Sequence, residues 1–259
     1  MDKRHILGSK VNLVSCNKAT QKVLDWSGNR SSRYVCLANA HMIMEAYDSK
    51  KFWEILNAAD LTLPDGMSLV GSLRILGVAN QEQVCGRNLT LSLCEQAAKR
   101  EIAVGFYGSS NKVLDNLARN LRQRYPNLNI SYIYSPPFRP LSCKEEEAVI
   151  RDINASKARI LFVGLGCPKQ EYWMAKHKKH FQGVMVGVGA AFDFLSGIKP
   201  SPPRWLQNMG LEWLFRLCLE PRRLLYRNLW NNPRFILFFA LQITKSFFLL
   251  IQDDSLESS

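Results

Sequence analysis

Short apolar runs that alternate with amphipathic helical patterns constrain the fold of this chain more than any other feature. Between residues 113 and 125, Leu114, Leu117 and Leu121 recur at three- and four-residue steps, and arginines occupy the opposite face. Strands covered by helices on both faces are typical of a mostly parallel sheet. We therefore predict an α/β fold with strands at Tyr34–Ala38, Ile102–Tyr107, Ile130–Tyr134, Arg159–Val163 and Val184–Val188.

Polar or glycine-rich clusters follow these strands. They begin at Asn39, Pro64, Gly108, Gly164 and Gly187. The cluster at Pro64 follows a short apolar stretch, Ala59–Leu63, which we interpret as a further buried strand. Because parallel sheets carry their functional loops beyond the carboxyl ends of the strands, we expect one crevice to collect all of these residues.

The composition changes after residue 197. Pro200-Ser-Pro-Pro marks a rigid break and precedes a tract dense in Trp, Leu and Arg, which Pro221 and Pro233 interrupt. We predict an α/β core over residues 1–197 and a helical appendage over residues 198–259, with helices at Leu206–Leu219 and Arg222–Trp230.

The last apolar run, Phe235–Ile251, contains Lys245 and is shorter than the roughly 20 apolar residues that a bilayer-spanning helix needs. We expect it to lie on a membrane surface. The alternative is a helix packed on the core or on a partner subunit. The apolar face of this helix must be covered when the protein is off the membrane, so a homo-oligomer remains an alternative.

The charge and the cysteines of the chain indicate its class of partner and its cellular compartment. Lys and Arg number 34 against 22 Asp and Glu, a net charge of +12, which indicates an anionic partner such as nucleic acid, phospholipid headgroups or a phosphorylated substrate. The 7 cysteines show no metal-site spacing and are typical of reduced thiols. Residues 1–16 contain no continuous apolar segment of a secretion signal, so we expect a cytoplasmic protein.

Asp65 and Asn39 are the first candidate site residues. A carboxylate after a buried strand can act as general base toward a sugar hydroxyl, although Pro-Asp-Gly is also ordinary turn chemistry. Asn39 can bind a sugar or base through its amide, or cap the helix that follows it. The two interpretations of Asn39 are compatible.

The segment Val163-Gly-Leu-Gly-Cys-Pro-Lys-Gln-Glu171 is the most specific stretch of the chain. Lys169 replaces the third glycine of a dinucleotide-binding loop, and no phosphate-binding loop of the ATPase type is present in the sequence. A glycine-rich turn before a helix can still bind phosphate through free N–H groups. Gln170 and Glu171 then become candidates for binding the hydroxyl groups of a donor substrate. Tight strand-to-helix packing is the alternative explanation for the glycines.

The appendage carries five arginines among large apolar residues, namely Arg204, Arg216, Arg222, Arg223 and Arg227. Guanidinium groups bind phosphates in a bidentate manner, and the apolar neighbours suit lipid. A diphosphate at a membrane interface fits this pattern, whereas a solvated face is the alternative. His177 and His180 lie among lysines, and we interpret them as a solvated helix face without a metal.

Together these elements resemble the WecG/TagA/CpsF glycosyltransferase family, from about Val11 to Trp230. The matching segments are Asn39-Ala-His, Ala59–Gly66, Gly86-Arg-Asn-Leu, Val163–Glu171, Gly187–Phe194, Gly210–Leu217 and Glu220-Pro-Arg. The resemblance implies a Rossmann-like core and an inverting, metal-independent transferase without a cofactor. It also implies a UDP-sugar donor (N-acetylmannosamine, its uronic acid or a hexose), a polyprenyl-diphosphate-linked acceptor sugar, and action at the inner face of the cell membrane in teichoic acid, capsule or exopolysaccharide synthesis.

Residue by residue, the resemblance implies that Asp65 is the catalytic base, Asn39 a substrate-binding amide and Gln170 a donor-site residue. Arg216, Arg222 and Arg227 match the arginines expected to grip the diphosphate. The remaining candidate substrate-binding residues are Arg87, Gly108, Gly164, Gly166, Lys169, Glu171 and Gly189. This sequence departs from the family at Leu37, where a hydroxyl residue is common, and at Pro200–Pro203, where a basic segment is common.

Two other classes of function remain as alternatives. A sugar-nucleotide epimerase or hydrolase would use the same crevice without a lipid acceptor and would not need the appendage. A basic nucleic-acid-binding protein would need exposed aromatic side chains for stacking, whereas most aromatics here recur at core-like spacing. We therefore expect no nucleic-acid partner.

Overall fold

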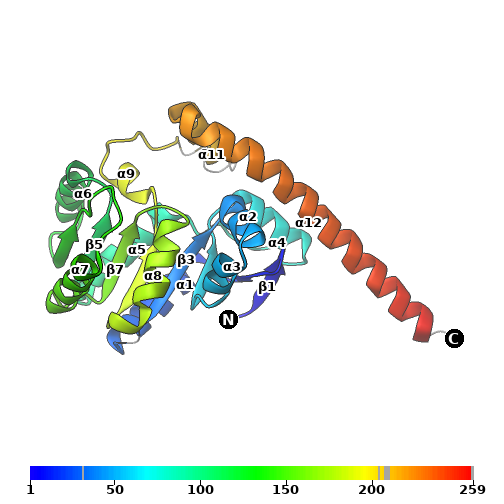
Figure 1. The fold of residues 1–259 in the computed structure, drawn as a ribbon, viewed down its shortest axis with the longest axis horizontal. Helices are drawn as coiled ribbons and strands as arrows, with labels where there is room; N and C mark the ends of the chain where they lie inside the picture. Colours follow the sequence, from blue (N-terminus) through cyan, green and yellow to red (C-terminus); the bar gives the residue numbers. More distant parts are fainter. Residues whose placement is uncertain (31, 204, 207–210, 258–259) are drawn as a thin grey trace.

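A computed structural model describes residues 1–30, 32–203, 205–206 and 211–257, with the side chains of 223, 226, 227 and 246–257 left out. Six parallel strands form the central sheet in the order β4-β3-β8-β7-β5-β6 (Figure 1). The strands are β3 (Arg33–Ala38), β4 (Leu61–Pro64), β5 (Val104–Gly108), β6 (Ile130–Tyr134), β7 (Ile160–Gly164) and β8 (Val184–Gly187). The predicted α/β fold with a parallel sheet is confirmed, and β4 lies in the apolar stretch before Asp65.

Helices cover both faces of the sheet, because alternate strand residues are apolar on both sides. In β7, Ile160 and Phe162 enter one core cluster, and Leu161 and Val163 enter the other. On the first face lie α1 (Cys16–Gly28), α5 (Gly86–Lys99), α6 (Asn111–Arg124) and α9 (Ala191–Leu195). On the second lie α2 (Ala40–Asp48), α3 (Lys50–Asn57), α4 (Met67–Ile75), α7 (Cys143–Ala155) and α8 (Lys169–His177), the last followed by the short η1 (Lys178–His180).

An antiparallel hairpin, β1 (Lys3–Ile6) and β2 (Ser9–Asn12), was not predicted. It packs beside β4, where the Asn12 side chain accepts a 2.8 Å hydrogen bond from the backbone N–H of Thr62. The hairpin therefore covers the outer edge of the sheet.

The chain reverses its winding between β5 and β7. From β5 it crosses by α6 to β6 on one side, whereas from β7 it crosses by α8 to β8 on the other. Since α6 and α8 lie on opposite faces, the carboxyl ends of β5 and β7 form a topological switch point, where α/β proteins commonly bind ligands.

The appendage contains α11 (Glu212–Leu219) and α12 (Pro221–Glu257). The prediction that Pro233 interrupts the helix was wrong, because α12 runs through it. Pro233 is exposed, so the carbonyl that loses its helical hydrogen bond faces outward. On either side of it, Asn231 and Arg234 contact the core, at His41 and Asp48.

Side-chain contacts hold α12 along α2 and the hairpin. Arg234 forms two hydrogen bonds with the Asp48 carboxylate at 2.9 and 2.6 Å, and Phe238 stacks on Tyr47 with ring centroids 4.8 Å apart. The Gln242 amide accepts from the Leu7 N–H at 2.8 Å and donates to the His5 carbonyl at 2.9 Å. Up to Gln242 the helix is thus part of the folded body.

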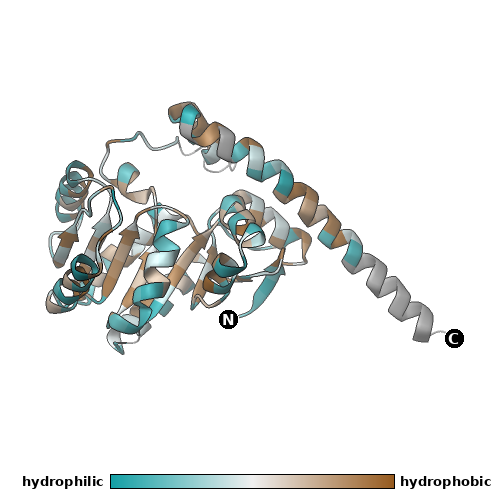
Figure 2. Ribbon diagram, viewed as in Figure 1, coloured by the Kyte–Doolittle hydropathy of each residue, from teal (hydrophilic) through white to brown (hydrophobic). Residues whose placement is uncertain are grey.

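Hydropathy separates the two parts of the molecule. The strands of the central sheet are mostly apolar, whereas the hairpin strand β1 is hydrophilic and α12 mixes polar and apolar residues over its coloured length (Figure 2). No helix within the described ranges combines the length and apolarity needed to cross a bilayer.

The expected solvated face at His177 was a wrong prediction. His177 is buried, its Nδ1 lies 2.8 Å from the Trp173 carbonyl oxygen, and burial lowers the pKa of its imidazole. The neighbouring lysines project outward from the same turns, which explains why their charge misled the interpretation. His180 is exposed.

Candidate active site

Asp65 and Asn39 lie side by side at the carboxyl ends of β4 and β3. The backbone N–H groups of Asp65 and Gly66 both donate to the Ala38 carbonyl, at 2.9 and 3.1 Å. A Cβ atom on Gly66 would lie 2.9 Å from the Cβ of Asn39, so only glycine permits this approach. Adjacent strand ends thus bring the two predicted residues together.

Asn39 caps α2, as one of the two interpretations predicted. Its side-chain oxygen accepts from the Met42 N–H at 3.1 Å. The capping bond uses only the oxygen of the amide, and Asn39 also lines the pocket at Asp65. The cap therefore fixes the orientation of a side chain whose NH₂ group is still available to a ligand.

The Asp65 carboxylate lies at the amino end of α5, where its Oδ1 accepts from the Gly86 N–H at 3.2 Å. Burial, and to a smaller extent the negative charge of Glu212, raise the pKa of Asp65 to about 7. The charge of Arg216 and the Gly86 hydrogen bond act in the opposite direction. A carboxylate with a pKa near neutrality is suited to accept a proton in a reaction at physiological pH.

A pocket of about 450 Å³ opens in front of Asp65. The core contributes Asn39, His41, Asp65, Ser68 and Gln83; α11 contributes Glu212, Trp213 and Arg216; α12 contributes Leu224, Asn228, Asn232, Phe235 and Ile236. Side chains from strand ends and from the appendage thus share one cavity. We call it the Asp65 pocket.

Glycines line the crevice between β5 and β7. Gly108 has a φ of +116°, and a Cβ atom there would lie 2.7 Å from the carbonyl carbon and oxygen of Gly164. A Cβ on Gly164 would lie 2.5 Å from the Phe192 ring. Both distances are shorter than side-chain carbons reach, so glycine at 108 permits the approach of the two strand ends, and glycine at 164 leaves room for the Phe192 ring. We call this region the glycine crevice.

Gln170 joins the loops after β7 and β8. Its side-chain oxygen accepts from the N–H groups of Gly166 and Gly189, both at 3.1 Å. Its NH₂ group donates to the Glu171 carboxylate at 2.8 Å. Both side chains are buried, and burial raises the pKa of Glu171 to about 7. This geometry lets Gln170 position the glycine loops; the predicted contact with donor hydroxyls stays a prediction. Lys169, one residue earlier, is exposed.

A profile of the glycosyl transferase WecG/TagA/CpsF family matches residues 4–247, almost the length of the fold just described. The chain belongs to this family. It is similar to an N-acetylglucosaminyldiphosphoundecaprenol N-acetyl-beta-D-mannosaminyltransferase of Bacillus spizizenii, with 30% identity over 204 residues, or 78% of this chain and 77% of the relative. A Staphylococcus aureus protein of the same name is 27% identical over 222 residues, 85% of each chain. The WecG/TagA/CpsF relationship makes this protein a glycosyltransferase.

The predicted arginines of this WecG/TagA/CpsF member fall into three groups. Arg216 lines the Asp65 pocket, and its guanidinium lies 5.7 Å from the centre of the Phe194 ring. Arg222 is exposed in the first turn of α12, and Arg87 is half-buried in the first turn of α5 beside Gly86. Arg204 lies outside the described residues, as do the side chains of Arg223 and Arg227.

Sequence reasoning missed Glu212, Asn228 and Asn232 as pocket residues. Glu212 belongs to the family segment Gly210–Leu217, but nothing in the sequence placed it near Asp65. Leu37, a departure from the family pattern, is buried in the core, and a Cβ atom on Gly86 would lie 3.2 Å from its side chain.

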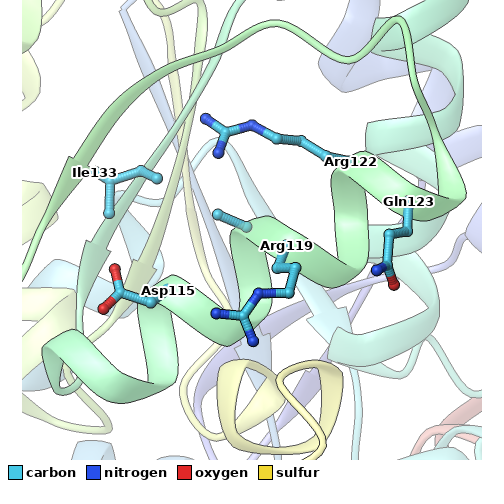
Figure 3. Close-up of a pocket in the computed structure, with 6 residues that line it drawn as sticks. Asp115, Arg119, Arg122, Gln123 and Ile133 are labelled. Atoms are coloured by element: carbon cyan, nitrogen blue, oxygen red, sulfur yellow. The ribbon is translucent and has the colours of Figure 1, made fainter.

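A second cavity, of about 600 Å³, lies on the outer side of α6 (Figure 3). It is lined by Asp115, Arg119, Arg122 and Gln123 of that helix and by Ile133 of β6, and it contains none of the predicted site residues.

Proposed function

We propose that this glycosyltransferase moves N-acetylmannosamine from its UDP derivative to N-acetylglucosamine linked to a polyprenyl diphosphate. The names of the relatives motivate the two sugars and the lipid acceptor. The single observation that carries the proposal is the Asp65 pocket, where a carboxylate with a pKa of about 7 faces a cavity closed by the appendage. The uronic acid and a hexose are the alternative donor sugars.

The reaction that we propose is a single displacement with inversion. An acceptor hydroxyl oxygen attacks the anomeric carbon of the donor sugar from the face opposite the UDP group. The bond from that carbon to the phosphate oxygen breaks, UDP leaves with the electron pair, and Asp65 takes the hydroxyl proton. General-base assistance of this kind is worth about 10²–10⁴-fold in rate.

Separate regions support binding of the two substrates. The glycine crevice lies at a winding reversal, a position that suits the donor diphosphate. The N–H groups of Gly166 and Gly189 donate to Gln170, so a diphosphate bound there would take the place of that side chain. Candidate donor contacts there are Gly108, Gly164, Gly166, Lys169 and Gly189. Arg216, Arg222 and Arg87 stabilise the negative charge that develops on the leaving phosphate, without a metal ion.

The appendage, residues 198–259 in our division of the chain, would hold the protein on the inner face of the cell membrane. Supporting this, α12 presents Leu225, Leu229, Trp230, Leu237 and Leu241 with 46–65% of their surface exposed. Such an apolar face beside arginines suits an anionic lipid surface.

The test is UDP release by the full-length protein over a panel of UDP-sugars, with and without a short-chain polyprenyl-diphosphate N-acetylglucosamine. We expect release that requires the lipid acceptor, is fastest with UDP-N-acetylmannosamine and collapses in Asp65→Asn. Asp25→Asn, on the exposed side of α1, is the matched control. Release that is independent of the acceptor would instead favour the hydrolase or epimerase alternative.

A further inference from the structure

Two asparagines of α12 face the Asp65 pocket with their amides unused. Asn228 and Asn232 are one helical turn apart, both are half-buried, and both line the cavity. Neither side chain makes a hydrogen bond to another residue in the described part of the chain. Asn231, between them, behaves differently: its Nδ2 lies 3.1 Å from the Nδ1 of His41, and it is 7% exposed.

Half-buried amides without protein partners lose hydrogen bonds that water or a ligand must replace. Asn231 avoids this cost by packing against His41. Asn228 and Asn232 instead keep two donors and an acceptor each for the cavity. Their position is therefore explained by a ligand that satisfies them.

The position of these amides relative to Asp65 is fixed. Two residues beyond Asn232, Arg234 binds the Asp48 carboxylate at 2.9 and 2.6 Å, and Phe235 is buried against the core. Because the anchor lies within one turn of Asn232 and two turns of Asn228 on the same helix, the amides cannot shift without breaking contacts between α12 and α2. The amides and Asp65 thus form a preorganised set.

The chemistry of the pocket fits an uncharged sugar. The amide groups of Asn228 and Asn232 can both donate and accept, as sugar hydroxyl and acetamido groups do, and Asn39 adds an NH₂ donor. Trp213 adds an aromatic surface for the apolar face of a ring. Ile236 also lines the pocket but is 65% exposed, so the cavity opens onto the apolar face of α12.

We propose that Asn228 and Asn232 recognise the acetamido sugar of the lipid-linked acceptor, whose lipid chain leaves the pocket over Ile236. This inference rests on the proposed function and extends it, since it assigns acceptor specificity to α12 and leaves donor specificity to the core. Arg216, which lines the same pocket, is then on the appendage side of this ligand.

The experiment measures the Kd of a short-chain prenyl-diphosphate N-acetylglucosamine on the full-length chain by calorimetry, separately from UDP release. One lost hydrogen bond corresponds to about a five- to tenfold increase in Kd. We expect that increase for Asn228→Ala and for Asn232→Ala, a larger one for the double variant, and an unchanged Kd for a UDP-sugar. Thr244→Ala, exposed near the other end of the described side chains of α12, serves as the control.

A second comparison addresses the acetamido group. An acceptor analogue with a hydroxyl in place of the acetamido group should bind the wild-type protein less tightly than the acceptor does. In the double variant, the two compounds should bind with equal affinity. An acceptor Kd within twofold of wild type in a double variant with an unchanged Tm would overturn the inference, as would an equal loss of donor affinity. If the acceptor binds as expected but wild type releases no UDP with it, the proposed function fails and the inference stands.

Discussion

The glycine crevice and the Asp65 pocket share one edge of the sheet but are built differently. The crevice comes from the ends of β5 and β7 and the loop after β8, all within the core, and its shape depends on backbone atoms that nearly touch. The Asp65 pocket joins the ends of β3 and β4 to helices that lie about 150 residues later in the chain. One region is therefore fixed by sterics, and the other by side-chain charge and by helix docking.

Asp65→Asn tests the pocket with the largest expected effect. We expect kcat to fall by about 10²–10⁴-fold, because the base is lost while the shape is kept. Asp25→Asn should leave kcat unchanged, and an active Asp65→Asn variant would remove Asp65 from the mechanism.

The same substitution, which should lower kcat, should raise the stability of the protein at high pH. Burial raises the Asp65 pKa from 3.8 to about 7, so the folded state binds this proton more tightly than the unfolded state does. The corresponding stabilisation is present at low pH and is lost as the pH rises from about 4 through about 7. Asn carries no charge, so the variant should have a higher Tm than wild type at pH 8 and no such advantage at pH 4.

Gly164→Ala tests the crevice. The new methyl group would lie 2.5 Å from the Phe192 ring, so we expect about 1–3 kcal/mol less unfolding free energy and weaker donor binding. Gly71→Ala, in the middle of α4 with no atom within 4 Å of the added carbon, should instead stabilise by about 0.5–1 kcal/mol. Equal effects in the two variants would mean that the close packing of Gly164 against Phe192 does not matter.

Glu212→Gln and Arg216→Met form a matched pair that probes the electrostatics of the pocket. Removing the Glu212 charge lowers the pKa of Asp65, and removing the Arg216 charge raises it. The acid limb of the pH–kcat profile should therefore shift to lower pH in Glu212→Gln and to higher pH in Arg216→Met. Shifts in the same direction would show that the appendage does not act on Asp65 through charge.

Helix docking gives the smallest expected effect. Arg234 and Asp48 are partly exposed, so their pairing should contribute about 0.2–1 kcal/mol despite its bidentate geometry. A double-mutant cycle with Arg234→Ala and Asp48→Ala measures that coupling from the unfolding free energies. A coupling of zero would assign the docking of α12 to its other contacts, among them Phe235, Phe238 and Gln242.

These two regions also differ in how far the sequence could predict them. The crevice followed from local patterns, because glycine directly after an apolar strand marks a strand end at Gly108 and at Gly164. Asp65 and Asn39 were found in the same way. The proximity of Glu212 to Asp65 could not be predicted from the sequence, since it depends on how α11 packs over the sheet.

The other failures have physical causes as well. Lys3–Ile6 and Ser9–Asn12 lack the alternation of a half-buried strand, so the hairpin gave no signal. Pro233 usually ends a helix, but contacts at Asn231 and Arg234 hold both sides of it in line. His177 looked solvated because local charge says nothing about which side of a turn faces the core.

Because Asp65 and Glu212 lie far apart along the chain, the two sides of the pocket are synthesised at different times. A nascent chain that has emerged only to residue 200 contains every strand, both glycine loops and the Asp65 carboxylate. It contains neither the Glu212 charge nor the α12 wall of the pocket. Under the proposed function, such a chain would hold the candidate base without the wall of its pocket, and the last quarter of the polypeptide would complete the catalyst.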